Sequence, residues 1–122
     1  METKSRPAYK VIFYRTLQGV EPVREWLQSF DKRERLQLGQ AIQTLQRTGP
    51  ALAMSYAYRL GGGLFELREQ VGKVRSRIFY AFDGNRVVVV LHAATKDQRV
   101  RGDDRALARR RLKDYLERRT MI

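Results

Sequence analysis

Two spacings of hydrophobic residues alternate along the chain and divide it into predicted strands and helices. Residues 8–14 are rich in aromatic and β-branched side chains, which favour a pleated strand. After Pro22, apolar side chains recur every three or four residues as far as Phe30, which is the spacing of one helix face. A strand followed by a short amphipathic helix is therefore predicted.

A second helix is predicted from the residues at its two ends. Asp31 and Glu34 have the spacing of a capping box, in which each side chain satisfies a backbone N–H of the first turn. Gly49 marks the other end, so the two helices are expected to form a hairpin. Residues 51–59 show no clear periodicity, and an irregular segment is expected there. The apolar face of the second helix carries Leu38, Ala41, Ile42 and Leu45.

Three further strands are predicted at residues 64–70, 74–83 and 86–93, where β-branched and aromatic side chains are frequent. Short connections containing glycine separate them, so neighbouring strands are expected to pair antiparallel. Residues 103–119 carry apolar side chains on one stripe and arginines elsewhere, which predicts a basic amphipathic helix. The predicted order is β-α-α-β-β-β-α. It describes an α+β fold whose antiparallel sheet packs against an N-terminal helix hairpin and a C-terminal helix.

The net charge of the chain indicates the class of its partner. A length of 122 residues suits one hydrophobic core, so a single domain over residues 1–122 is expected. The 25 lysines and arginines outnumber 13 acidic residues, which leaves a formal net charge of +12. A positive field of this strength favours an anionic partner: RNA, DNA, an acidic protein or an anionic membrane surface.

Composition also excludes several kinds of site. The chain has no cysteine and one histidine, so a disulfide framework, a thiolate metal site and a histidine-rich metal site are impossible. We expect neither a metal nor a cofactor. The longest apolar run, at residues 86–91, is too short to span a bilayer, and the polar N-terminus lacks an apolar signal core. A cytoplasmic location without a membrane partner is therefore expected.

The predicted strand at residues 74–83 carries the most informative polar side chains. Its period-two alternation places Arg75 and Arg77 on the face opposite the apolar residues. Glu66 and Arg68 alternate in the same way on the preceding strand, so they can lie next to Arg77 across the hairpin. Guanidinium groups suit phosphate oxygens, and a carboxylate among cations can accept a proton. Two interpretations stay open: a phosphate-binding site, or a solvated face with a structural salt bridge.

Further candidates lie toward the C-terminal end. His92 ends the last predicted strand and has a side chain that titrates near neutrality, although a lone histidine at a strand end is more often structural. Lys96 lies in a polar basic loop, and loops often carry function. Basic side chains of the turns, this loop and the last helix are expected to contact phosphates or an acidic partner. The predicted RNA-contacting set is Lys73, Arg75, Arg99, Arg101, Arg105 and Arg109.

Several short motifs, taken in order, resemble the phage-derived HigB-like branch of the RelE/ParE toxin superfamily. Each motif is weak alone, but their order and spacing over nearly the whole chain are specific. The resemblance implies a RelE-like fold and the toxin of a type II toxin–antitoxin system, an endoribonuclease that cleaves mRNA on the ribosome. It also implies a cognate antitoxin, usually a helix-turn-helix protein. The matching segments are residues 13–15, 19–27, 60–68, 77–80, 91–96 and 108–116.

The same resemblance assigns roles to residues. Arg77 falls on the arginine with which such toxins hold the scissile phosphate, Glu66 and Arg68 on a strand with further polar site groups, and Lys96 on the basic loop. Without a metal cluster or a cysteine, the RNA 2′-hydroxyl is the expected nucleophile. Arg77 and Arg68 are then predicted to stabilise phosphoryl charge. Glu66 is the candidate base, and Lys96 or His92 the candidate proton donor or electrostatic aid.

Two alternative functions stay open at this point. Related toxins of the same fold block a DNA topoisomerase by protein contact, without catalysis. A basic nucleic-acid-binding regulatory module would also account for the charge of the chain, although it leaves the placement of Arg68 and Arg77 unexplained.

Overall fold

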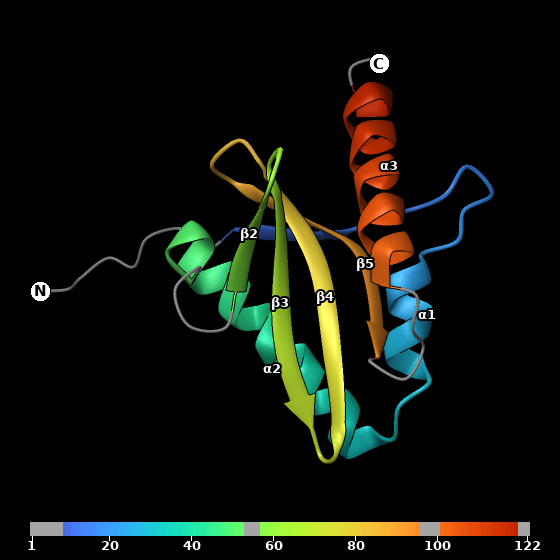
Figure 1. Cartoon of the computed structure of the whole chain (residues 1–122), viewed down its shortest axis with the longest axis vertical. Coiled ribbons are helices and arrows are strands. Elements are labelled where there is room, and N and C mark those ends of the chain that lie inside the picture. Colours follow the sequence, from blue (N-terminus) through green and yellow to red (C-terminus); the bar gives the residue numbers. More distant parts are fainter. Residues whose placement is uncertain (1–8, 53–56, 96–100, 120–122) are drawn as a thin grey trace, which may run out of the picture.

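The computed structural model describes residues 9–52, 57–95 and 101–119, which form a mixed α+β fold around one sheet (Figure 1). None of the helices in these ranges is both long and apolar enough to cross a membrane. The elements are β1 (Lys10–Phe13), α1 (Pro22–Gln28), α2 (Lys32–Thr48), the 3₁₀ turn η1 (Gly49–Leu52), β2 (Ala57–Gly61), β3 (Leu64–Val71), β4 (Val74–Asp83), β5 (Val87–Thr95) and α3 (Arg101–Arg119).

The described strands form a five-stranded sheet in the order β1-β5-β4-β3-β2. Strands β2 to β5 pair antiparallel, as predicted for the three strands of the meander. β1 instead runs parallel to β5, with Lys10 opposite Val87 and Phe13 opposite Val90. The expectation of an antiparallel sheet is therefore wrong at this edge. Parallel neighbours need a long connection, which a tight turn cannot provide; here the connection from β1 to β5 consists of α1, α2, η1 and the strands β2 to β4.

The expectation of an irregular segment at residues 51–59 is wrong at its C-terminal end, where β2 begins. β2 pairs with β3, placing Tyr58 opposite Glu66, and this additional strand makes the order β-α-α-β-β-β-β-α. The turn into β3 uses Gly61, Gly62 and Gly63, whose φ angles of 88°, 62° and 83° suit glycine. β2 escaped detection because it lies at the sheet edge. Tyr58 and its neighbour Arg59 are both exposed, so the strand lacks period-two alternation.

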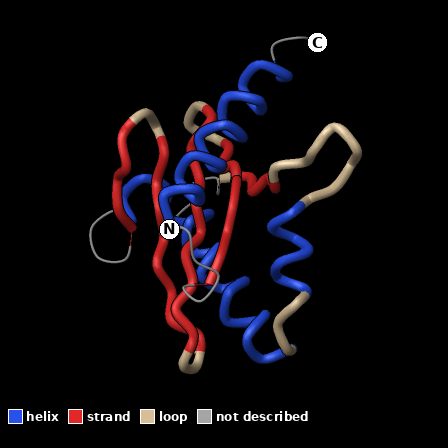
Figure 2. Tube along the Cα trace, turned by 45° about the vertical axis from the view of Figure 1, so that its right-hand side comes forward, coloured by secondary structure: helices blue, strands red, loops and turns tan. Residues whose placement is uncertain are grey.

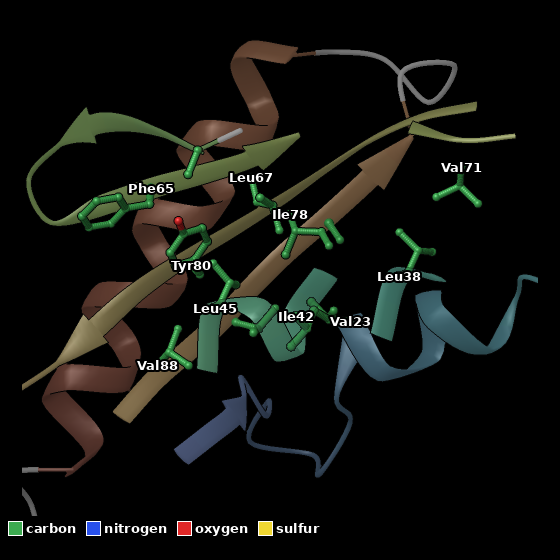
Figure 3. Packing of buried hydrophobic residues seen from close by; sticks show 13 residues of the cluster. Val23, Leu38, Ile42, Leu45, Phe65, Leu67, Val71, Ile78, Tyr80 and Val88 are labelled. Carbon is green, nitrogen blue, oxygen red and sulfur yellow. The ribbon is translucent and has the colours of Figure 1, made fainter. Parts of the chain in front are cut away.

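Helices α1 and α2 cover one face of the sheet. The capping box predicted for α2 is present, since the Asp31 carboxylate accepts a hydrogen bond of 2.8 Å from the Glu34 N–H. The apolar face of α2 is buried, with Leu38 and Leu45 each 0% exposed. Burial of a leucine side chain stabilises a fold by about 1.5–3 kcal/mol. Figure 3 shows Val23, Leu38, Ile42 and Leu45 of the two helices facing Phe65, Leu67, Ile78, Tyr80 and Val88 of the sheet.

Helix α3 packs on the opposite face, so that helices lie on both sides of the strands (Figure 2). Its Ala108 is fully buried, and Leu112 and Tyr115 pack against the same cluster. The sheet contributes Leu64, Phe79, Ala81, Val89 and Leu91 to this second cluster.

Polar contacts determine where α3 crosses the sheet. The Tyr115 hydroxyl donates to Asp83 at 2.8 Å, and the Tyr14 hydroxyl donates to Asp114 at 2.6 Å. The Arg109 guanidinium donates to the Leu60 carbonyl at 2.7 Å. These contacts hold α3 over one end of the sheet. The opposite ends of β3 and β4 extend beyond the helix (Figure 1), and polar side chains line the face there.

The stability of the α2 face is testable with two leucines of the same helix. Leu38→Ala is expected to lower the free energy of unfolding by about 2–5 kcal/mol, because the side chain is fully buried. Leu36 is 62% exposed, so Leu36→Ala is expected to change this free energy by no more than about 0.5 kcal/mol. Denaturant titration measures both. Equal losses would show that α2 does not pack on the sheet as described.

Candidate functional site

A carboxylate and two guanidinium groups meet on the α3 side of the sheet, beyond the end of the helix. Arg68 of β3 lies opposite Arg77 of β4 in the antiparallel register, and Glu66 lies one pair further along the same face. Glu66 Oε2 lies 3.3 Å from Arg77 Nε and 3.5 Å from Arg68 Nε. The structure therefore brings together the three residues that strand alternation placed side by side.

The three side chains differ in their exposure to solvent. The Glu66 side chain is 1% exposed, whereas those of Arg77 and Arg68 are 23% and 50% exposed. The carboxylate thus lies at the floor of the site and the guanidinium groups reach the surface. A guanidinium group has five N–H donors, and contact through Nε leaves further donors for an anionic ligand. Glu66 therefore orients two cations that would otherwise repel each other.

Tyr58 completes one side of this cluster. The Arg68 guanidinium carbon lies 4.0 Å from the centre of the Tyr58 ring, a cation–π geometry that restricts the arginine. Tyr58 was missed from the sequence because its strand was not recognised. The available signal was an aromatic residue shortly before the glycine turn.

An open hollow of about 400 Å³ adjoins the two arginines. Arg75, a predicted RNA contact, is exposed and lies opposite Gln70. Lys73, also predicted, is exposed in the turn between β3 and β4. The arginine hollow is lined by Arg68, Glu69, Gln70, Arg75, Ser76 and Arg77, so three cations and one acid surround it. This excess of positive charge suits the phosphates of a nucleic acid.

His92 lies on the same face but outside the cluster. It pairs with Phe79 across the β4–β5 ladder, and the two rings stack with their centres 5.7 Å apart. Phe79 in turn pairs with Glu66, so two strand spacings, about 10 Å, separate His92 from Glu66. His92 is thus separated from the carboxylate of the cluster, although it is a diagonal neighbour of Arg77 across the β4–β5 ladder, and its side chain contacts Phe79, Asp104 and Arg111 instead.

The contacts of His92 determine its protonation. Asp104 Oδ1 lies 2.9 Å from His92 Nε2, and an Arg111 nitrogen lies 3.4 Å from Nδ1. Because arginine can only donate, Nδ1 accepts and the proton is assigned to Nε2. Burial lowers the pKa of His92 below its ordinary value of 6.5, and Asp104 offsets this only in part. Near neutral pH His92 is therefore neutral. The sequence pattern did not distinguish Asp104 or Arg111 from the other charged residues of the last helix.

The remaining predicted residues are distributed over α3 and the segment before it. Arg105 is exposed on α3. The Arg109 guanidinium donates hydrogen bonds to the carbonyls of Leu60 and Gly61 in the glycine turn. RNA contact by Arg109 stays a prediction. Lys96 and Arg99 lie outside the described residues, as does the side chain of Arg101.

The depressed pKa of His92 makes a prediction about stability. Below pH 6.5 the unfolded chain takes up a proton on His92 more readily than the folded chain, so acidification favours unfolding. The free energy of unfolding is expected to fall more steeply between about pH 7 and about pH 5 in the parent than in His92→Gln, which retains a donor to Asp104. Denaturant titrations at several pH values measure the difference. Parallel pH profiles would contradict a depressed pKa.

Comparison with known proteins identifies the family of the chain. A search of curated proteins gives no match. The family described as "Phage derived protein Gp49-like (DUF891)" matches residues 25–113, which include α2, all four antiparallel strands and the cluster of Glu66, Arg68 and Arg77. Because the match covers well over half of the 122 residues, the chain belongs to the phage-derived Gp49-like family.

Proposed function

We propose that this protein is the toxin of a type II toxin–antitoxin system and that it cleaves mRNA at the arginine hollow as a metal-independent endoribonuclease. The observation that carries the proposal is the pair Arg68 and Arg77, both held by the buried Glu66 carboxylate at the edge of an open basic hollow. Membership of the phage-derived Gp49-like family, the resemblance to RelE/HigB toxins and the net charge of +12 support it.

The reaction uses a nucleophile from the substrate. The RNA 2′-oxygen attacks the adjacent phosphorus and loses its proton, while the bond from phosphorus to the 5′-oxygen breaks and that oxygen gains a proton. The products are a 2′,3′-cyclic phosphate and a 5′-hydroxyl end. Negative charge develops on the phosphoryl oxygens, where Arg77 and Arg68 can donate hydrogen bonds. DNA lacks the 2′-hydroxyl, so it can bind but cannot react in this way.

The contacts of the site favour different roles for the other candidates. Glu66 is 1% exposed and contacts both arginines, so it acts in this proposal as a positioning residue. A base role would require the 2′-hydroxyl to reach a buried carboxylate. His92 is neutral near pH 7, which argues against it as the proton donor. Lys96 stays the candidate donor, and it lies outside the described residues.

Two macromolecular partners belong to the proposal. The resemblance points to mRNA on the ribosome as the substrate. It also points to a cognate helix-turn-helix antitoxin. The excess of basic side chains predicts that the antitoxin presents an acidic surface, because complementary charge accelerates association.

Arg77→Lys tests the proposed active site, because lysine keeps a cation beside buried Glu66 but lacks the planar fork that binds two phosphoryl oxygens. Cleavage is expected to fall about 100-fold to about 1000-fold, the usual effect of losing one charge-stabilising donor. RNA end mapping with translating ribosomes measures it. Arg33→Lys is the matched control, since Arg33 is exposed on α2 across the sheet, and it is expected to cleave like the parent.

The outcomes separate the alternative functions. Equal cleavage by parent and Arg77→Lys, at equal melting temperatures, would place the active site elsewhere. A parent that leaves RNA intact but inhibits DNA supercoiling would identify a topoisomerase inhibitor. RNA binding without either activity would identify a regulatory module.

A further inference from the structure

A second hollow, of about 300 Å³, lies on the other side of β5 from the arginine pair. β1 ends at Phe13, opposite Val90, so within the described strands the rest of β5 lacks a partner on this side. α1 and the first half of α3 enclose the space instead, and Figure 1 shows α1 beside the end of β5. The α1–β5–α3 pocket is lined among others by Pro22, Trp26, His92, Ala94, Asp104 and Arg111.

The pocket and the arginine hollow are neighbours. Ala94 lines the pocket and pairs directly with Arg77 across the β4–β5 ladder. One strand spacing, about 5 Å, therefore separates the backbone of the phosphate-binding arginine from the floor of the pocket. A group attached to a phosphate on Arg77 is therefore within reach of the pocket.

Trp26 provides an unused hydrogen-bond donor in the lining. Its Nε1 is buried and has no hydrogen-bond partner in the part of the chain that the structure describes. A buried N–H without a partner is unfavourable, so a ligand acceptor that reached this nitrogen after a small movement of the ring would satisfy it. The indole ring also offers an aromatic surface, and its edge-to-face contact with Phe30, at 4.8 Å between ring centres, holds it in place.

Asp104 provides a matching acceptor. Its Oδ1 accepts the hydrogen bond from His92 Nε2, and a carboxylate has about four acceptor positions in total. Arg111 donates to the Leu91 carbonyl at 2.9 Å and also contacts His92, so His92 is held from both sides. Asp104 can thus accept from a ligand N–H without losing its contact to His92.

Proteins hold an unstacked RNA base with an aromatic side chain and with hydrogen-bond donors and acceptors. The pocket offers the Trp26 ring and its N–H, the small Ala94 side chain and the Asp104 carboxylate. We propose that the α1–β5–α3 pocket binds one nucleobase of the RNA strand whose phosphate lies on Arg77, and that it selects bases with an exocyclic amino group. Adenine, cytosine and guanine can donate from that amino group to Asp104. Uracil has no exocyclic amino group; its two carbonyl oxygens flank its one ring donor, N3–H, and face the carboxylate unfavourably. The inference rests on the proposed RNA substrate and adds to it a subsite for one base.

Trp26 is the one tryptophan of the chain, so its fluorescence reports directly on the pocket. The probes are 2′-O-methyl trinucleotides of adenine, cytosine, guanine or uracil, which cannot be cleaved, and an abasic trinucleotide of equal charge. The three amino-bearing trinucleotides are expected to change the emission saturably, with the uracil probe binding about fivefold more weakly. The abasic probe is expected to bind without changing the emission. Unchanged emission with every base, or equal changes with all five probes, would overturn the proposal.

Two conservative variants test the donor and the acceptor by the anisotropy of labelled trinucleotides. Trp26→Phe removes the N–H and keeps a ring, and it is expected to weaken binding of amino-bearing probes about fivefold at an unchanged melting temperature. Asp104→Asn still accepts from His92 but offers an amide N–H₂. The affinity of the uracil probe is therefore expected to rise relative to the affinities of the other probes. Asp103→Asn, with the same charge change at an exposed position of α3, is expected to keep the parent's order of preference. An unchanged order in Asp104→Asn, or undiminished binding in a stable Trp26→Phe, would refute the assignment.

The pocket and the proposed function can fail separately. Base-dependent binding by a protein that leaves RNA intact would support the pocket and reject the nuclease. Cleavage that depends on Arg77, by a protein whose binding ignores the identity of the base, would support the nuclease and reject the pocket.

Discussion

The buried Glu66 carboxylate is the constraint on which the site depends. Transfer of a carboxylate from water into a protein costs several kcal/mol unless opposite charges and hydrogen bonds compensate. Glu66 is 1% exposed, and the compensating cations beside it, Arg68 and Arg77, lie within 3.5 Å. The fold therefore cannot release both arginines without leaving the carboxylate uncompensated. This requirement holds two guanidinium groups close together beside one carboxylate.

The same carboxylate resolves a conflict in the sheet. Arg68 and Arg77 lie directly opposite each other on β3 and β4, and like charges in that position destabilise a pair of strands. Glu66 contacts both and removes the conflict. Tyr58, 4.0 Å from the Arg68 guanidinium carbon, restricts that side chain further. The arginines at the polar end of the face are thus held by specific contacts, yet this end remains accessible because α3 is held over the opposite end by Asp83 and Asp114.

A β-bulge in β5 places two consecutive residues, Leu91 and His92, on the same face of the sheet. Val90 pairs with Tyr80 and His92 pairs with Phe79, so Leu91 is an additional residue on β5. The extra residue lets Leu91 pack under α3 while His92 still stacks on Phe79 from the same side of the sheet. His92 thereby reaches Asp104 and Arg111 of α3, and these contacts close one wall of the α1–β5–α3 pocket. The arginine hollow and the α1–β5–α3 pocket therefore lie on opposite sides of β5.

Local patterns along the sequence determined most of the secondary structure and part of the site. The capping box at Asp31, the buried stripe of α2 and the alternation that placed Glu66, Arg68 and Arg77 on one face depend on near neighbours in the chain, and all are present. β2 was missed because both Tyr58 and Arg59 are exposed at the sheet edge, which removes the alternation that marks a strand. Only the tertiary structure decided the parallel pairing of β1 with β5, because pairing between distant segments leaves no local periodicity. It also decided that Arg109 holds the glycine turn and that Asp104 and Arg111 hold His92, since these partners come from different elements that only packing brings together.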